Sequence, residues 1–151
     1  MRVAIDARLL TGAYTGDRTY WRGLLKALIR QLEGSAHQLV LFSARPLPPE
    51  ALPPSPVWET VVIPARSERW WSLWHFPRAA QRYGCHVAHM QYTVSPLFRI
   101  PAITTVHDIS FLIAPEWFGW KDRWLLRLTV PPSCRRAARV LTVSETSRED
   151  M

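Results

Sequence analysis

Short runs of apolar, largely β-branched residues alternate along the chain with longer segments whose apolar positions recur every three to four residues. The first pattern is typical of buried strands and the second of amphipathic helices. The expected strands are residues 3–7, 38–43, 58–63, 86–89, 102–106 and 140–143. Six strands that alternate with helices predict an α/β fold with a parallel, doubly wound sheet and right-handed crossovers.

The helical pattern predicts three long helices. The first follows a tight loop at residues 11–16 and ends near residue 32, the second covers residues 69–83, and the third covers residues 120–137. Because proline cannot donate a backbone hydrogen bond, we expect a bend near Pro77 and a break or kink at Pro131 and Pro132. Ser144 is expected to cap a further helix.

Two other segments stand out. Six prolines between residues 46 and 56 predict a surface connector, since neither a helix nor a central strand tolerates them. Three tryptophans, Trp70, Trp71 and Trp74, open the second long helix. We interpret them as packing in the core or between domains; an exposed ring could instead rest on a sugar or a membrane interface.

Composition fits one domain with a sizeable core, because 48% of the 151 residues are hydrophobic. The net charge is +7, and the cations are almost all arginine, which suits anionic oxygens such as phosphate. Arg18, Arg22, Lys26 and Arg30 recur four apart in the first long helix. We interpret this basic row as a solvated outer face, with docking on an anionic membrane as the alternative.

Cysteine and histidine usage adds little chemistry. Cys85 and Cys134 are interpreted as free thiols of a cytoplasmic protein. Asp6 interrupts the first apolar run, so this start does not resemble a signal peptide or a membrane span. Strand alternation places His86 and His89 on opposite faces, and we assign no metal site to them.

Polar residues follow several of the expected strands. The strand at residues 102–106 ends on His107 and Asp108, and the last strand ends on Ser144 and Glu145. In an open parallel sheet ligands gather outside the carboxyl ends of the strands. The loops at residues 12–16, 89–92, 107–108 and 144–145 are therefore expected at one edge. A lone histidine after a strand often pairs with a loop carbonyl, but this convergence favours a functional role for His107.

Several short motifs occur together in a fixed order. They are Val3-Ala4-Ile5-Asp6-Ala7-Arg8 with Thr15-Gly16 and Tyr20, Trp70-Trp71, Val106-His107-Asp108, Pro115-Glu116-Trp117-Phe118 and Val140-Leu141-Thr142-Val143-Ser144-Glu145. In order and spacing the chain resembles the N-terminal domain of glycosyltransferase family four. The resemblance implies a GT-B fold, in which two Rossmann-like domains face each other across a cleft.

In that fold the first domain holds mainly the acceptor and the second holds most of the nucleotide-sugar donor. The resemblance implies that residues 1–151 form the first domain, with the C-terminal donor-binding domain absent. That second domain typically carries two glutamates eight positions apart, and no two glutamates in this chain have that separation.

The resemblance also assigns site residues. Gly12 and Gly16 would let backbone amides approach the donor, and Arg18 stands where the family often has a second glycine. Its guanidinium could contact a phosphate instead. His107 would lie near the transferred sugar and hydrogen-bond its hydroxyls, while Asp108 would orient the loop rather than act as a nucleophile.

The remaining assignments concern the rim of the cleft. Ser144 and Glu145 would cap a helix that points at the donor, although capping alone would explain them. His89 and Tyr92 are the expected acceptor-binding residues. The implied reaction needs no metal and no cofactor beyond the nucleoside diphosphate sugar.

The predicted function is therefore the acceptor side of a retaining, hexosyltransferase-type enzyme, inactive alone. Its partners would be the donor-binding domain, in cis or as a second chain, and a sugar or lipid-linked acceptor; exposed apolar surface also suggests a homodimer. We expect a cytoplasmic location, with peripheral contact on the inner face of the membrane. The alternative is a non-catalytic Rossmann-like binding module that docks on an anionic membrane. A dehydrogenase lacks support because the first loop has no G-x-G-x-x-G spacing, and nucleic-acid binding lacks a stacking platform.

Overall fold

The computed structural model describes residues 1–12 and 15–151, and its six strands form one sheet in the order β3-β2-β1-β4-β5-β6. All neighbouring strands are parallel, so the predicted doubly wound α/β fold is confirmed. The strands are β1 (Arg2–Asp6), β2 (Gln38–Ser43), β3 (Trp58–Val62), β4 (Val87–Gln91), β5 (Ala102–Thr105) and β6 (Arg139–Leu141).

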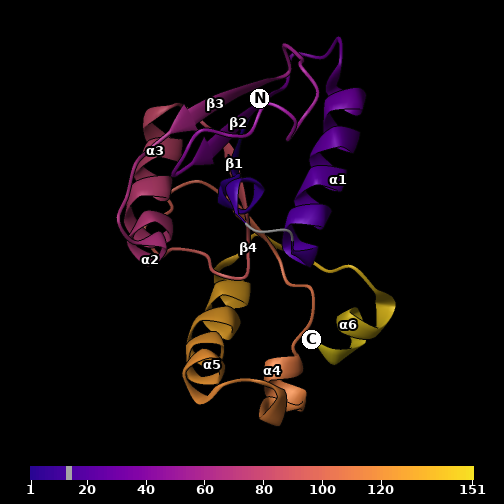
Figure 1. The fold of residues 1–151 in the computed structure, drawn as a ribbon, viewed down its shortest axis with the longest axis vertical. Helices are drawn as coiled ribbons and strands as arrows, with labels where there is room; N and C mark the ends of the chain where they lie inside the picture. Colours follow the sequence, from indigo (N-terminus) through magenta and orange to yellow (C-terminus); the bar gives the residue numbers. More distant parts are fainter. Residues whose placement is uncertain (13–14) are drawn as a thin grey trace.

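Helices cover both faces of this sheet. Figure 1 shows α1 (Gly16–Leu32) on one side, with α3 (Phe76–Arg82) and α5 (Trp120–Arg136) on the other. The chain reverses its direction of travel across the sheet between the neighbours β1 and β4. The crevice outside such a switch point is where ligands bind in open α/β sheets. The loops after β1, β4 and β5 all emerge at this carboxyl edge.

The core lies in two layers, one on each face of the sheet. On the α1 side, Trp21 and Leu25 pack with Leu41 of β2. On the opposite side, Trp71 and Phe76 pack with β2 through Phe42. Five of the six residues of β2 are buried, whereas all three residues of β6 are exposed. The sheet is therefore well covered at its centre and open at the β6 end.

The second predicted helix is continuous but irregular. It consists of α2 (Glu68–Trp70), the π-helical turn η2 (Trp71–His75) and α3. The backbone N–H of Phe76 bonds to the Trp71 carbonyl, five residues earlier, so the distortion near Pro77 takes the form of a π turn. The core interpretation of the three tryptophans is correct for Trp71 alone, because Trp70 is 63% and Trp74 is 42% exposed.

The predicted break in the third helix is wrong, because α5 is a single helix with Pro131 and Pro132 inside it. Prolines at these positions remove the hydrogen bonds to the carbonyls of Arg127 and Leu128. Both of those residues are exposed, so water can hydrate the carbonyls that lose a partner. The helix therefore continues through the prolines at a lower cost than in a buried helix.

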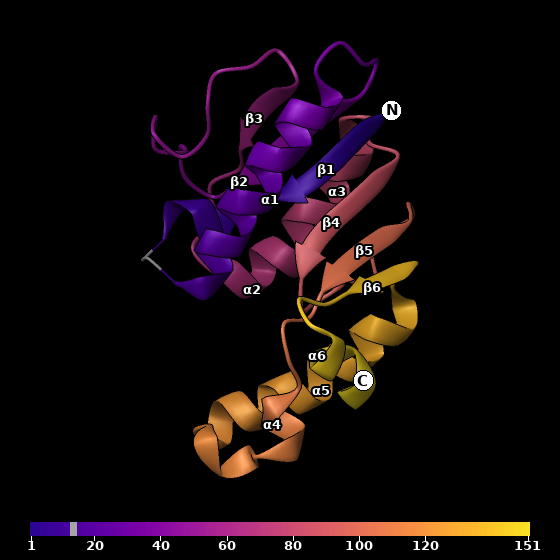
Figure 2. The same ribbon diagram turned by 90° about the vertical axis from the view of Figure 1, so that its right-hand side faces the viewer.

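Short elements complete the fold. They are the 3-10 turns η1 (Arg8–Thr11) and η3 (Pro115–Trp117), with the short helices α4 (Ser110–Ile113) and α6 (Glu145–Asp150). Ser144 caps α6 as predicted, with its Oγ accepting a hydrogen bond from the Ser147 backbone N–H at 3.1 Å. Ala13 and Tyr14, in the predicted tight loop, lie outside the described residues. Figure 2 shows α4 and the start of α5 at the end of the molecule opposite β3.

Candidate functional site around His107

His107 lies at the carboxyl edge, just after β5, and faces the start of α1. Its Nε2 is 3.2 Å from Oδ1 of Asp17, which directly follows Gly16. The two side chains are 15% and 38% exposed, and Nε2 of His107 is itself buried, so the exposed part of the pair is mainly Asp17. The contact falls short of hydrogen-bond geometry, so its strength depends on the charge of the imidazole. The tertiary structure thus brings His107 to the first loop, as the predicted convergence requires.

Two tyrosine rings enclose His107. The Tyr20 ring meets it edge-on with 4.8 Å between centroids, and the Tyr92 ring lies 5.9 Å away. The Tyr20 hydroxyl is also 3.0 Å from Oγ1 of Thr105 at the end of β5. We call Asp17, Tyr20, Tyr92 and His107 the His107 cluster. It joins three loops or helix ends that are far apart in the sequence.

Tyr92 adopts an unusual backbone conformation at the end of β4. Its φ is 56°, in the left-handed region that non-glycine residues rarely occupy. Burial raises the pKa of its phenol, and the charges of Asp17 and Asp108 act in the same direction. The phenol therefore stays neutral and can both donate and accept a hydrogen bond. Strained backbone of this kind occurs often at binding sites.

His89 supports the cluster from below. The residue is 6% exposed, its Nε2 is 2.9 Å from Oγ1 of Thr105, and its ring packs edge-on against Trp21. Burial lowers the pKa of His89 to about 4, so the imidazole is neutral near pH 7. The structure places His89 beneath Thr105 instead of on the surface. A contact between His89 and an acceptor, as predicted, would therefore have to be relayed by the Thr105 hydroxyl.

Asp108 shapes the chain after His107. One of its carboxylate oxygens, Oδ1, accepts a hydrogen bond from the Ser110 backbone N–H at 2.8 Å. This contact fixes the turn that leads into α4. The catalytic assignments of His107 and Asp108 remain predictions.

Hydrogen bonds tie the first loop to α1. Thr15 caps α1 by accepting from the Arg18 backbone N–H, and the buried Arg18 guanidinium donates from Nη1 to the Gly12 carbonyl at 2.9 Å. Among the described residues, an added Cβ at Gly12 or Gly16 would meet nothing within 4 Å. The donor contacts of both glycines remain predictions.

The interpretation of the basic row on α1 as a solvated face needs correction. Arg18 is 8% exposed, and Arg22 donates from Nη2 to the Glu50 carbonyl at 3.0 Å. Both side chains fold back onto neighbouring loops because backbone carbonyls in those loops offer hydrogen-bond acceptors. The row is therefore partly structural.

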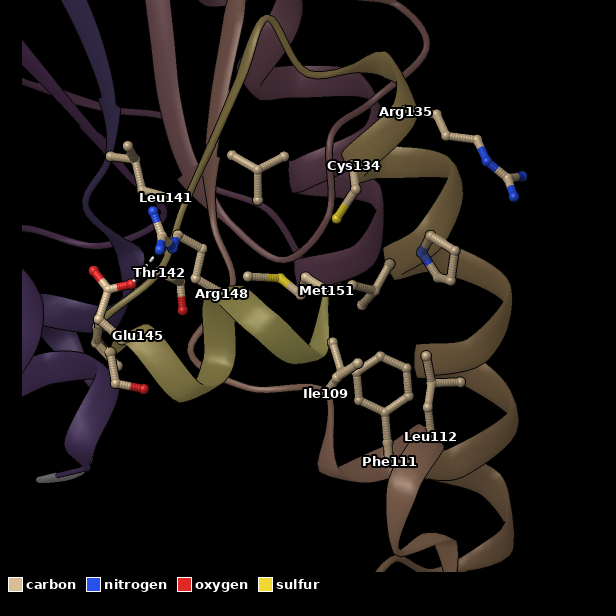
Figure 3. A pocket seen from close by; sticks show the side chains of 15 residues that line it. Ile109, Phe111, Leu112, Cys134, Arg135, Leu141, Thr142, Glu145, Arg148 and Met151 are labelled. Carbon is tan, nitrogen blue, oxygen red and sulfur yellow. Dashed lines mark ion pairs between the residues drawn. The ribbon is translucent and has the colours of Figure 1, made fainter.

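Ser144 and Glu145 lie in a different place from the His107 cluster. They line a pocket of about 910 Å³ between α4, α5, β6 and α6, together with mostly apolar side chains such as Phe111 and Leu141. Figure 3 shows Glu145 paired with Arg148, and their side-chain atoms are 2.6 Å apart. Their predicted donor contacts remain predictions. The described part of the chain thus has a polar cluster and a neighbouring apolar pocket.

The sequence reasoning missed Asp17 as a site residue. An acidic residue in the first turn of a helix is favoured by the helix dipole alone, so its identity carries no specific signal. Thr105 was also missed, because a threonine in a strand is ordinary and its identity carries no specific signal. Within residues 1–12 and 15–151, no three His, Cys, Asp or Glu side chains are grouped as metal ligands require. The expectation of a metal-independent reaction remains a prediction.

In the described part of the chain, no helix has the length and apolar character needed to cross a bilayer.

Comparison with known proteins places the chain in a family. No curated protein matches the sequence. The model of Glycosyltransferase Family 4 matches residues 22–151, which is most of the chain and includes His107, β4, β5 and β6. The Rossmann-like parallel sheet agrees with this match. This chain therefore belongs to glycosyltransferase family 4.

Proposed function

We propose that this chain is the acceptor-side domain of a retaining glycosyltransferase that takes a sugar from a nucleoside diphosphate sugar. The observation that carries the proposal is the pairing of His107 with Asp17 at the carboxyl edge, in a chain of this family. The Asp17 side chain is 38% exposed, and the pair lies beside the first loop where the sheet reverses direction. That position is where an α/β sheet presents ligands.

The chemistry of the His107 cluster suits a carbohydrate. An imidazole, a carboxylate and two phenol hydroxyls supply both donors and acceptors, as the hydroxyls of a sugar require. Aromatic rings beside these groups can pack against the apolar face of a sugar ring. On this proposal His107 and Asp17 hydrogen-bond to sugar hydroxyls, and Tyr92 binds the acceptor.

The remaining roles belong to the donor side. Gly12, Gly16 and the start of α1 would face the diphosphate, with Arg18 holding the loop in place. Ser144 and Glu145 would line the rim. Most groups that neutralise the departing nucleotide would come from a C-terminal donor-binding domain, in cis or as a second chain. The chain alone should therefore be inactive, and it would work in the cytoplasm without a metal.

A binding experiment on the 151-residue chain tests the role of the cluster. Histidine side-chain NMR signals are recorded while simple glycosides and nucleoside diphosphate sugars are added at millimolar concentration. We expect the His107 signals to shift, while those of His86 stay fixed because it binds the Arg2 backbone at the opposite edge. His107→Gln identifies the His107 signals, because they are the ones that disappear from the spectrum of this variant. Shifts at His86 alone, or none at all, would contradict the proposal.

An activity assay tests the incomplete-enzyme part independently. The chain is incubated with a radiolabelled nucleoside diphosphate sugar and candidate acceptors, and transfer is measured by chromatography. We expect no turnover without a second polypeptide. Sustained transfer by the chain alone would refute the assignment to the acceptor side.

The alternative function, a non-catalytic module on an anionic membrane, is favoured by the exposed tryptophans of α5.

A further inference from the structure

The outer side of α5 and the turn before it expose large apolar side chains. Trp117, Trp120, Trp124 and Leu128 are 75%, 71%, 57% and 67% exposed. We call these four residues the tryptophan face. Contiguous apolar patches of this kind are uncommon on isolated soluble proteins and mark interaction surfaces.

The tryptophan face is distinct from the side of α5 that packs against the protein. Leu126 and Val130 join a small core cluster with Phe111. At about 100° per residue, Trp120, Trp124 and Leu128 span about 80° of the helix surface, roughly opposite that cluster. The helix is therefore apolar on two sides, one buried and one exposed. A surface helix of a soluble domain needs only the buried side.

Positive charges border the tryptophan face. Arg127 and Lys121 fall on either side of it, each about 20° beyond the apolar residues. Both are exposed, and Arg135 and Arg136 follow at the end of the helix. Within α5 the single acidic residue is Asp122, so the helix carries an excess of positive charge. This excess agrees with the net charge of +7 for the chain.

Tryptophan next to arginine and lysine matches the chemistry of a bilayer interface. The indole ring prefers the boundary between headgroups and acyl chains, and each nearby cation is attracted to anionic lipid. We propose that the tryptophan face docks on an anionic membrane surface, with α5 lying in the plane of the headgroups. Figure 2 shows α4 and the start of α5 at one extremity of the molecule, where they can approach a flat surface.

The docking surface and the apolar pocket are carried by the same helix. The pocket of about 910 Å³ is lined by Val130 and Pro131 on one side of α5, and the tryptophan face lies on the other side. His107 and Asp108 lead directly into α4. The docking itself does not depend on sugar transfer, so the two proposals can fail separately.

Vesicle sedimentation tests the docking. The chain is mixed with vesicles of phosphatidylcholine containing 30% phosphatidylglycerol, or with pure phosphatidylcholine vesicles. We expect binding to the anionic vesicles, weakened by added salt, and a blue shift of tryptophan emission. The double variant W120S/W124S should bind at least about tenfold more weakly, because two interfacial rings are lost. Circular dichroism checks that the variant is folded.

The matched control is W70S/W74S, which removes two exposed tryptophans from a different helix, the one formed by α2 and η2. It should bind like the unaltered chain. Absence of binding, or an equal loss in both double variants, would overturn the proposal. Light scattering without lipid gives a further check, because a dimer that W120S/W124S dissociates would assign the tryptophan face to a second copy of the chain instead.

Discussion

α1 and α5 are both 17 residues long, and both combine tryptophan with several arginines, yet they meet opposite environments. Trp21 of α1 is fully buried against the sheet, where its ring meets His89 of β4, while Trp124 of α5 is 57% exposed. Arg18 and Arg22 of α1 donate to loop carbonyls, whereas Arg127 of α5 is exposed. Similar sequence features thus build a core in one helix and a surface in the other.

The difference arises from what lies beside each helix. α1 packs across the centre of the sheet, where β1 and β2 present buried aliphatic residues on its side. α5 lies toward the β6 end, where the sheet is open and a small cluster around Val106, Phe111 and Val130 covers one side of the helix. A periodic pattern indicates that a helix has an apolar face. Whether that face is buried depends on the strands and helices that pack beside it.

The largest effect is expected from truncating equivalent tryptophans in the two helices. Trp21→Ala should lower the free energy of unfolding by about 3–5 kcal/mol, because it empties a fully buried site. Trp124→Ala should change it by less than about 0.5 kcal/mol, since the ring is largely hydrated. Urea denaturation measures both. Similar losses in the two variants would abolish the distinction between the helices.

A second variant at Trp21 separates the effect of lost packing from the effect of the indole N–H. The Trp21 indole N–H is buried and has no hydrogen-bond partner among residues 1–12 and 15–151. Trp21→Phe keeps an aromatic ring and removes that N–H, so it should cost much less than Trp21→Ala.

A pH effect of intermediate size is expected on the α1 side. The folded-state pKa of His89 is about 4, below its ordinary value of 6.5, because burial disfavours the charged imidazole. The unfolded chain therefore binds more protons between these values, and stability falls as the pH decreases from 6.5 toward 4. At pH 4.5 the loss should reach about 2–3 kcal/mol relative to pH 7. Urea titrations at several pH values measure it.

His89→Gln is the control for this pH effect, since an amide does not titrate. Above pH 7 the free energy of unfolding should depend on pH in the same way for the chain and the variant. Below pH 6.5 it should fall more steeply for the unaltered chain. Parallel curves throughout that range would show that His89 is not buried against Trp21 in solution.

The smallest effect tests the buried side of α5. The Ser133 hydroxyl accepts from the Val94 backbone N–H at 2.9 Å and donates to the Thr129 carbonyl. Ser133→Ala leaves that N–H buried without a partner and should cost about 1–2 kcal/mol in urea unfolding. Ser72→Ala removes a hydroxyl that donates to the Glu68 carbonyl of its own helix and should cost less than about 0.5 kcal/mol. Equal costs would indicate that α5 is not docked through Ser133.

Sequence patterns predicted the elements well where one signal dominated. The β-branched runs located all six strands within a few residues, and Ser144 identified the cap of α6. The paired prolines do not break the helix, because α5 continues through them, and a kink there stays a prediction. Of the three tryptophans at residues 70–74, Trp71 packs in the core, whereas Trp70 and Trp74 are exposed.

The candidate site was predicted in outline only. The convergence of loops at one edge brought His107 to the start of α1, but its partner Asp17 carried no signal beyond that of an ordinary helix start. Ser144 and Glu145 share the carboxyl edge with His107 yet line a separate pocket. Strand order fixes which edge a residue reaches, whereas the path of each loop fixes its neighbours there.

The amino-acid sequence by itself determined the period of each segment, and therefore the alternation of strands and helices and the parallel sheet that follows from it. The tertiary structure alone decided which apolar faces are covered and which polar groups meet. The physical reason is that hydrophobic periodicity is a local property of the chain. Burial and pairing depend instead on neighbours that are distant in sequence, as Trp21 and Trp124 show.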